Sequence, residues 1–311
     1  MVRRRAATTI EVMRQRPRDV PAEVQPGSFR APLIALPDRA RRPGTDEDDA
    51  RLSDVDEWGR SERVRRVVRS AGRFYYRYWF RVEWEHLERV PTSGGALLIA
   101  NHAGAIPPDA PMIMHGIEEE VGRPVYGLAD DWFRTVPFVG TIWSRAGGVA
   151  AHPDNAHRLL HDQRQLVLVF PEGEKGPAKH VSERYRLRRF GRGGFVETAM
   201  RAGVPVVPIA VVGAEEAMPI LYKVPGARRA LGVPYLPITA NHLLFGPLLG
   251  TVAYLPARLR FRVLDPVSFG LEPEQPHYPR GRIMDEAETI RRRLQEELFD
   301  MLSQRRSIWF G

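Results

Sequence analysis

The sequence predicts an α/β fold, with a largely parallel central sheet that is flanked by helices. From about residue 82 onward, short apolar segments rich in Val, Ile and Leu alternate with longer segments of helical periodicity. The strongest strand candidate, LVLVF, is apolar at every position, as in a strand that helices cover on both faces. A basic amphipathic helix and a disordered N-terminal tail are predicted to precede this domain.

The composition narrows the classes of function. The chain has 311 residues, no cysteine and a formal net charge of +8. The lack of cysteine excludes disulfides, thiolate metal sites and a cysteine nucleophile. A positive net charge favours anionic partners, which include phosphate-bearing substrates, acidic membrane surfaces and nucleic acid. Charge alone does not choose among these three.

Residues 1–58 predict a disordered charged tail. The segment is rich in Pro, Arg and Asp, and it sustains no helical or strand period. Its basic first part is followed by the acidic run DEDDARLSDVDE. Because the acidic run offsets the basic residues, no nucleic-acid partner is expected. We assign residues 59–311 to a single domain.

Residues 60–82 have the pattern of an amphipathic helix. Aromatic and aliphatic side chains accompany an arginine at every fourth position, namely Arg65, Arg69, Arg73, Arg77 and Arg81. Such a helix suits a lipid headgroup interface, where aromatic rings lie at the boundary and cations meet phosphate. An ordinary surface helix packed on the core would show the same pattern, and both interpretations stay open.

The remaining elements follow in order along the chain. Strands are predicted at residues 82–87, 96–101, 124–129, 165–173, 204–213 and 258–265, and helices at 109–120, 130–145, 152–163, 194–203 and 281–306. The helix at 152–163 is expected to be capped near Asp154. The last helix is amphipathic and places Ile283, Ala287, Ile290, Leu294, Leu298 and Met301 on one face.

No apolar run is long enough to span a bilayer. The longest candidate, LLFGPLLGTVAYL at residues 243–255, is short and is interrupted by two glycines and a proline. The N-terminal residues are basic but lack the apolar core of a secretory signal. We therefore expect a cytoplasmic protein whose membrane contact is peripheral.

Two predicted strand ends, LLIANHAGAIPPD and LVLVFPEGEKG, carry polar side chains at the edge where functional groups gather in an α/β sheet. His102 is a candidate general base, and Asp109 is its candidate partner. Seven residues of continuous helix would separate these groups by about 10.5 Å. A direct pair therefore requires a non-helical link, which Gly104, Pro107 and Pro108 supply. A histidine beside a helix-capping aspartate would explain the same residues without catalysis.

The other histidines do not form a site. His157 and His161 have the spacing of metal ligands, but Arg158 occupies the position where a zinc protease has glutamate. No metal site is expected. His152 and His180 belong to no constellation of functional residues, and we expect them to be structural or surface groups.

The order of four blocks resembles a known family. NHAGAIPPD, GGVAAHPDNA, FPEGEKG and VPVVPI are similar to the blocks of the glycerolipid (lysophospholipid) acyltransferases, the 1-acylglycerol-3-phosphate acyltransferase superfamily. The resemblance covers about residues 82–265 and suggests a bacterial branch. It implies an acyltransferase domain in which His102 is the general base and Asp109 is its partner. The family usually has four residues between the histidine and the aspartate, whereas this chain has six, an HxxxxxxD motif.

The resemblance also implies an acceptor site at the FPEG block, with Glu172 central, and a strand end below the active site that Pro208 shapes. The family usually continues FPEG with Thr and Arg, where this chain has Glu174 and Lys175. The basic segment 175–192 suits a phosphate group of the acceptor or of CoA. These blocks supply the candidate substrate-binding residues, namely Asn101, Gly104, Phe170, Pro171, Glu172, Gly173, Lys175, Lys179, Arg189 and Arg192.

The function that this resemblance implies is acyl transfer in phospholipid biosynthesis. A fatty acyl group would move from acyl-CoA or acyl carrier protein to a hydroxyl of a lipid acceptor, with lysophosphatidic acid or another lysophospholipid as the default. The thioester is a co-substrate, and no resident cofactor is expected. The expected partners are the acyl donor, the lipid acceptor and an anionic membrane surface at the inner face of the cell membrane.

Two alternatives stay open. A serine-type lipid esterase is disfavoured because the chain contains no G-x-S-x-G elbow. A non-catalytic basic lipid-binding protein agrees with the arginine-rich helix and tail.

Overall fold

The computed structural model describes residues 54–129, 139–225, 235–270, 273 and 278–309. The chain divides into two compact units, 1–47 and 48–311, and all the described residues belong to the second. Residues 1–53 of the predicted tail therefore lie outside the described residues, and residues 54–58 lie within them.

The last residues of the predicted tail are ordered, which corrects the predicted boundary at residue 58. The indole Nε1 of Trp58 donates to the side-chain oxygen of Gln163 at 2.7 Å. The Asp56 carboxylate accepts from the hydroxyl of Tyr126 at 2.7 Å and from the backbone N–H of Arg60 at 2.8 Å. The acidic composition of this segment predicts disorder, and the sequence does not show this packing because the partners Gln163 and Tyr126 lie far along the chain.

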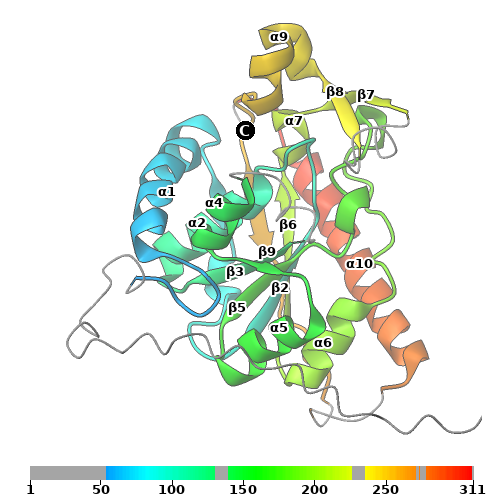
Figure 1. The fold of residues 1–311 in the computed structure, drawn as a ribbon. Helices are drawn as coiled ribbons and strands as arrows, with labels where there is room; N and C mark the ends of the chain where they lie inside the picture. The colour runs from blue at the N-terminus through cyan, green and yellow to red at the C-terminus, as the bar shows by residue number, and fades with distance from the viewer. Residues whose placement is uncertain (1–53, 130–138, 226–234, 271–272, 274–277, 310–311) are drawn as a thin grey trace, which may run out of the picture. The chain divides into compact units, whose positions relative to one another are not determined.

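A seven-stranded sheet forms the centre of the domain within the described residues (Figure 1). Its strands are β1 (Glu83–Glu85), β2 (Ala96–Ala100), β3 (Val125–Ala129), β4 (Gly148–Ala150), β5 (Leu166–Val169), β6 (Val206–Val212) and β9 (Arg260–Val263), in the order β1-β9-β6-β2-β5-β3-β4. The run from β6 to β4 is parallel throughout. β9 is antiparallel to β6 and parallel to β1. The predicted α/β fold with a largely parallel sheet is confirmed.

Helices cover both faces of the sheet. The described α-helices are α1 (Glu62–Phe74), α2 (Asp109–Val121), α4 (Val139–Ala146), α5 (Pro153–His157), α6 (Gly194–Ala202), α7 (Ala214–Ala217), α9 (Ala240–Val252) and α10 (Arg280–Ser303). Two π-helical turns, η1 (Tyr75–Trp79) and η3 (Arg158–Asp162), continue α1 and α5, and three short 3-10 turns are η2 (Leu87–Arg89), η4 (Gly173–Lys175) and η5 (Val181–Glu183). The first part of the predicted helix at 130–145 lies outside the described residues.

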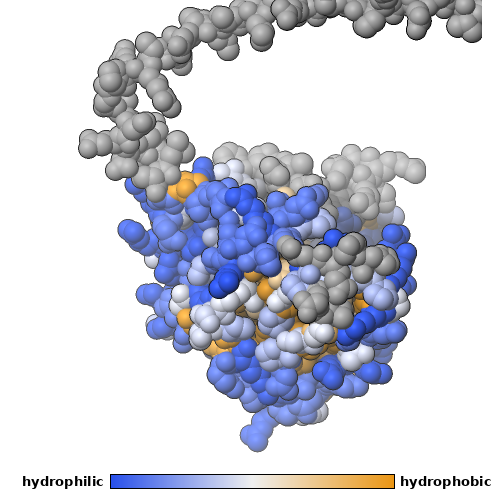
Figure 2. All heavy atoms as spheres, turned by 90° about the horizontal axis from the view of Figure 1, so that it is seen from below, coloured by the Kyte–Doolittle hydropathy of each residue, from blue (hydrophilic) through white to orange (hydrophobic). Residues whose placement is uncertain are grey.

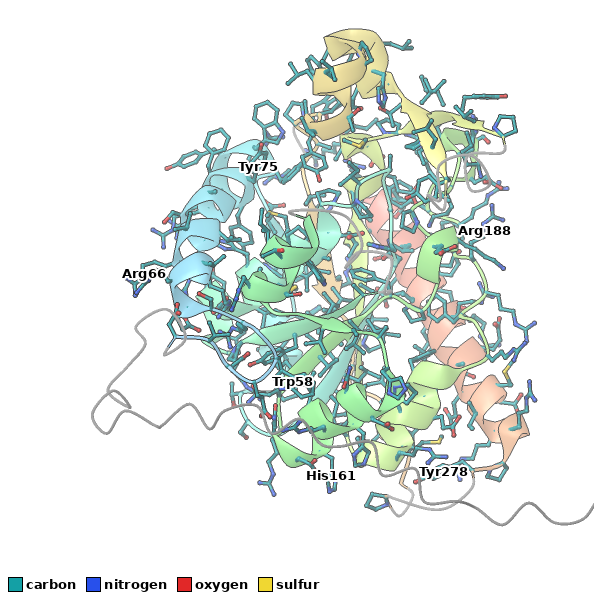
Figure 3. The ribbon with its side chains drawn as sticks, viewed as in Figure 1. Trp58, Arg66, Tyr75, His161, Arg188 and Tyr278 are labelled. Atoms are coloured by element: carbon teal, nitrogen blue, oxygen red, sulfur yellow. The ribbon has the colours of Figure 1, made fainter. Side chains whose placement is uncertain are left out.

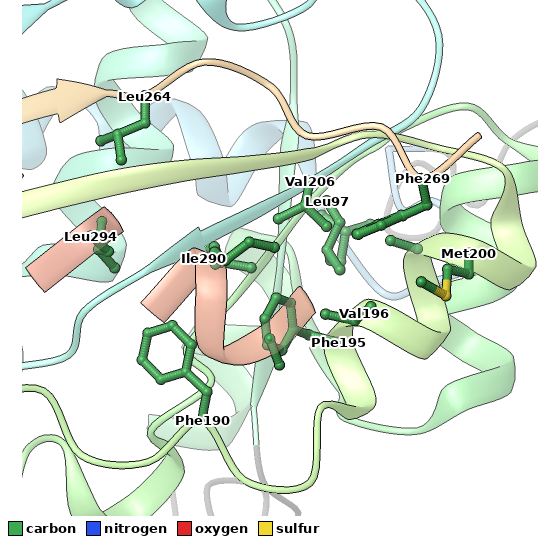
Figure 4. Close-up of a cluster of buried hydrophobic side chains, with 14 of the residues drawn as sticks. Leu97, Phe190, Phe195, Val196, Met200, Val206, Leu264, Phe269, Ile290 and Leu294 are labelled. Atoms are coloured by element: carbon green, nitrogen blue, oxygen red, sulfur yellow. The ribbon is translucent and has the colours of Figure 1, made fainter. Parts of the chain in front are cut away.

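Alternate residues of β2 point to opposite faces of the sheet, as the two-residue period of a strand requires. Leu97 and Ile99 pack with α6 and α10, while Leu98 packs with α2 and η1. Figure 4 shows the first of these cores, where Phe195 and Met200 of α6 lie with the side chains of α10. The predicted apolar face of α10 is confirmed, because each of Ile283, Ala287, Ile290, Leu294, Leu298 and Met301 is buried.

The cationic face of α1 lies against α2. Arg65 forms a salt bridge with Glu118, and Arg73 and Arg77 pair with Glu119 at 3.1 and 3.8 Å. The interpretation of an ordinary surface helix therefore accounts for these cations. Membrane contact by residues 60–82 stays a prediction.

Among the described residues, four elements between β6 and β9 were not predicted: the short helix α7 and the three elements that follow it. β7 (Ile220–Val224) and β8 (Leu236–Thr239) form a separate antiparallel pair, and α9 follows directly. Among the described helices, none combines the length and the apolar character that a membrane span requires. The cap expected near Asp154 is supplied by His152, whose side chain accepts from the backbone N–H of Asp154 at the start of α5.

Candidate active site

The end of β2 is fixed by Asn101. Its side chain is fully buried, and its amide forms two hydrogen bonds with the backbone of Val211 in β6. The side-chain Nδ2 donates to the Val211 carbonyl at 2.9 Å, and the Val211 N–H donates to Oδ1 at 2.8 Å. The chain leaves the sheet at this point, so the next residue, His102, lies at the carboxyl edge.

The loop between β2 and α2 brings His102 back to Asp109. Gly104 has φ +88°, which a glycine adopts without strain, and Pro108 immediately precedes the first residue of α2. The imidazole Nδ1 lies 3.0 and 3.1 Å from the two carboxylate oxygens of Asp109. The direct contact that the Gly and Pro residues permit is therefore present, while its catalytic role stays a prediction.

The Asp109 carboxylate has three donors around it. It is fully buried, and it accepts from the backbone N–H of Ala103 at 3.0 Å and of Ala110 at 2.7 Å as well as from the ring. Asp109 therefore stabilises the start of α2 and also orients His102. A carboxylate at Nδ1 favours the tautomer that carries its proton there, which leaves the lone pair on Nε2. No described residue hydrogen-bonds to Nε2, and the imidazole side chain is 15% exposed.

Phe170 and Gly176, which follow β5, pack against His102. The Phe170 ring stacks on His102 with 3.9 Å between centroids and 21° between planes. A Cβ at Gly176 would lie 2.9 Å from both the Cβ and the backbone oxygen of His102. The segment after β5 therefore packs directly against the histidine, and only a glycine fits at position 176 without displacement.

Glu172 joins the two strand ends that the sequence singles out. Its buried carboxylate accepts from the backbone N–H of His102 at 3.2 Å and from that of Arg188 at 2.7 Å. The ammonium of Lys179 lies 3.4 Å from both carboxylate oxygens and 3.2 Å from Glu215. One buried cation thus lies between two buried carboxylates below the histidine. Burial raises the pKa of Glu215, and the Lys179 ammonium opposes that shift.

The remaining predicted substrate-binding residues fall into two groups. Asn101 and Lys179 are buried and engaged with protein groups, so in this structure they support the site's framework. Gly173 and Lys175 on η4, and Arg189 and Arg192 beyond it, are exposed. Substrate contact by either group stays a prediction. Pro171 is half-buried between Phe170 and Glu172, and Gly104 would bring a Cβ within 2.9 Å of the Ala214 oxygen.

Sequence reasoning missed Glu215 and Gly176. Glu215 lies in the AVVGAEE segment after β6, but nothing in the sequence states that this segment lies beneath Lys179. His157 and His161 stack with 5.1 Å between ring centroids. In the described parts of the chain, no group of three or more His, Cys, Asp or Glu residues is arranged to hold a metal ion.

Comparison with known proteins places this geometry in a family. The family model described as Acyltransferase matches residues 81–212, which contain both strand ends of the site. An uncharacterized protein of Mycobacterium tuberculosis is 38% identical over 247 residues, which cover 79% of this chain and 68% of that protein. An uncharacterized protein of Mycobacterium leprae is 37% identical over 270 residues, covering 83% and 70%. The chain belongs to the acyltransferase family.

A solved structure is similar as well. The crystal structure of the 1-acyl-sn-glycerophosphate (LPA) acyltransferase PlsC from Thermotoga maritima matches with 18% identity and a TM-score of 0.49, over 78% of this chain and 80% of that one. The family membership supports an acyltransferase, with an acyl donor and an acyl acceptor as its substrates.

Proposed function

We propose that this acyltransferase moves a fatty acyl group from acyl-CoA or acyl carrier protein to a hydroxyl of a lipid, with His102 as the general base. Lysophosphatidic acid is the first acceptor to test, followed by other lysophospholipids. The observation that carries the proposal is the contact between the His102 ring and the buried Asp109 carboxylate, at the carboxyl edge of a parallel sheet.

In this mechanism, the acceptor hydroxyl lies within hydrogen-bond reach of the His102 Nε2. The imidazole takes the hydroxyl proton while the oxygen attacks the thioester carbonyl. The buried Asp109 carboxylate stabilises the imidazolium that forms. The carbon–sulfur bond then breaks, the thiolate takes the proton from the imidazolium, and the products are an ester and a free thiol. No covalent enzyme intermediate is needed, which agrees with a chain that lacks cysteine.

An anionic acceptor is supported by the exposed cations that follow the site. Lys175, Arg189 and Arg192 are exposed, and so are Arg184 and Arg186 of the same segment. Arginine and lysine side chains of this kind bind phosphate through charge-assisted hydrogen bonds. We also propose a peripheral position on the inner face of the cell membrane, because a lipid acceptor lies in a membrane and the enzyme must reach it there.

Thiol release tests the proposal directly. The purified chain contributes no thiol of its own, because it has no cysteine, so released CoA is read against a clean background. We expect release that depends on lysophosphatidic acid and falls by about 10²-fold or more in His102→Ala. The matched control is His152→Asn, which changes an exposed histidine and keeps a capping side chain on α5. Acceptor-dependent release that survives in His102→Ala would refute the assigned base.

The alternatives give different results in the same experiment. A lipid esterase would release fatty acid from an ester without a thioester, and a lipid-binding protein would bind vesicles without turnover.

Replacing Arg189 or Arg192 by Met tests whether the acceptor is anionic. We expect a raised KM for lysophosphatidic acid and an unchanged KM for an uncharged monoacylglycerol. Equal effects on both acceptors would argue against phosphate recognition by these side chains.

A further inference from the structure

α9 exposes a nearly continuous apolar surface. Its 13 residues, Ala240–Val252, include no charged side chain. Six large apolar side chains are exposed, from 42% for Phe245 to 88% for Leu248, and they are Leu243, Leu244, Phe245, Leu248, Leu249 and Val252. We call these six side chains the apolar tip. Contiguous apolar surface of this kind on a soluble domain marks a place that another molecule or a membrane covers.

The apolar tip belongs to a fixed hairpin. Gly246 has φ 78° and ψ 173°, so the helix is broken there and the chain turns back. A Cβ at Gly250 would lie 2.5 Å from the Cα of His242, which shows that the two halves of the hairpin are in close contact. The side-chain Nδ2 of Asn241 donates to the carbonyl of Ala253 at 2.6 Å and ties the two ends together. The tip is therefore held in place by its own backbone.

Aromatic side chains of η1 lie beside the base of α9. The rings of Tyr75 and Tyr254 are 6.3 Å apart, and the indole Nε1 of Trp79 donates to the Tyr254 carbonyl at 3.2 Å. Tyr78 is 70% exposed, and Phe74 is exposed as well. Figure 3 shows Tyr75 at the end of α1 that is nearer to α9. Tyr and Trp side chains are enriched where a protein meets the headgroups of a bilayer.

The same surface continues to the loop that joins His102 to Asp109. The hydroxyl of Tyr235, just before β8, donates to the carbonyl of Ala105 at 3.0 Å. Ile106, the next residue of that loop, has an exposed side chain. The hairpin that leads into α9 therefore packs, through Tyr235, on the segment that joins His102 to Asp109.

A bilayer fits this surface better than a protein partner does. A protein interface needs a polar rim with hydrogen bonds, and the tip offers no charged group. A 13-residue hairpin is too short to span a bilayer, but its apolar side chains can enter the boundary between headgroups and acyl chains. The ammonium of Lys223 on β7, an exposed residue whose Nζ also donates to the carbonyl of Ala178, adds a positive charge that suits an anionic surface. Figure 2 views the molecule from the end opposite α9, and that end is mostly hydrophilic.

We propose that α9 is the element with which this protein enters a lipid bilayer, by inserting the apolar tip into the outer part of one leaflet of an anionic membrane. The proposal concerns membrane binding and does not depend on the identity of the acyl acceptor. It assigns the insertion to residues 243–252 rather than to the cationic face of α1, whose arginines pair with α2.

Vesicle co-sedimentation of the full chain tests this assignment. The probe is a vesicle of phosphatidylethanolamine and phosphatidylglycerol, and the variant is the double substitution Leu244→Asp and Leu248→Asp. Both side chains are exposed, so the fold does not depend on them. We expect partition to vesicles at least about tenfold weaker than for the unchanged chain. The matched control is Phe299→Asp, the same kind of change at an exposed apolar side chain of α10, and it should retain binding.

Three results would overturn the proposal. The first is unchanged binding of the double variant. The second is loss of binding in Val67→Asp on α1 together with retention in the double variant, because α1 would then be the contact. The third is a lipid-free dimer that the double variant dissociates, because the apolar tip would then be an interface between two copies of the chain.

A second measurement places the tip directly. Because the chain has no cysteine, Leu248→Cys gives a single labelling site for an environment-sensitive fluorophore. Insertion predicts a blue shift on vesicle addition and quenching by lipids brominated on the acyl chain. An unshifted, unquenched label would contradict insertion. Turnover of a water-soluble acyl acceptor by the double variant should equal that of the unchanged chain, which separates failure of membrane binding from failure of the proposed catalysis.

Discussion

The substitution Asp109→Asn tests the central pair most sharply. Three donors, the ring Nδ1 of His102 and the backbone N–H groups of Ala103 and Ala110, share two carboxylate oxygens at 2.7 to 3.1 Å. An amide of the same shape supplies one acceptor oxygen and one NH2 group. The NH2 group therefore faces the backbone N–H of Ala103 or of Ala110, and it can also donate to the Nδ1 of His102, which moves the ring proton to Nε2, where a base needs a lone pair.

The expected size of the effect follows from this geometry. A positioned general base contributes roughly 10²- to 10⁴-fold to a rate, which is about 3 to 5 kcal/mol of activation free energy. We expect kcat of Asp109→Asn to fall within that range. A buried N–H left without an acceptor costs about 1 to 3 kcal/mol, and the free energy of unfolding should fall by that amount.

The assay combines acceptor-dependent thiol release with urea unfolding. The control is Asp154→Asn, because that carboxylate lies in the first turn of α5 and is 90% exposed. It should leave both measurements unchanged. A folded Asp109→Asn variant with kcat within about threefold of the unchanged chain would refute the view that the carboxylate sets the tautomer of the base.

Three further predictions concern the framework of the site and one buried histidine. Lys179→Met leaves two buried carboxylates without their cation and should lower the free energy of unfolding by about 3 to 5 kcal/mol in urea, whereas Lys175→Met at an exposed position should change it by less than about 0.5 kcal/mol. Gly176→Ala should lower kcat by up to about 10²-fold, because its φ of −62° suits alanine but the new Cβ would lie 2.9 Å from the Cβ and the backbone oxygen of His102 and must displace that residue; Gly194→Ala, with open space around it, should have no such effect. Burial lowers the pKa of His115 below 6.5, so the unfolded chain binds the proton first and the free energy of unfolding should fall as the pH drops through about 6.5; His115→Phe should remove that part of the slope, and an equal slope in both proteins would contradict the assignment.

Much of the fold could be predicted from local pattern. Local sequence is enough to predict some elements. The strands β2, β5 and β6 are continuous apolar runs, and α10 has apolar residues on one face only, so the periodicity of each segment predicts its structure. The insertion from β7 to α9 does not follow that rule. Its apolar run at residues 243–255 is too short for a membrane span, and an exposed apolar hairpin has the same composition as a buried helix.

The candidate site shows the same division between local and distant information. The approach of His102 to Asp109 follows from Gly104 and two prolines that lie between them. The contact from the backbone of His102 to Glu172 does not, because it depends on the side-by-side position of β2 and β5. The pairing of the α1 arginines with Glu118 and Glu119 was missed for a similar reason: the acidic run EEE that ends α2 is separated from them by more than forty residues.

The Asn101 side chain allows the chain to leave the sheet just before His102, so that the histidine lies at the sheet edge. Its primary amide reproduces the donor and acceptor of a peptide group, so the neighbouring strand keeps a complete ladder while the main chain of β2 is released from it. Aspartate would lack the donor, and leucine would lack both. The identity of this one residue thus decides whether the backbone can diverge at position 101 without leaving a buried peptide group on β6 unsatisfied.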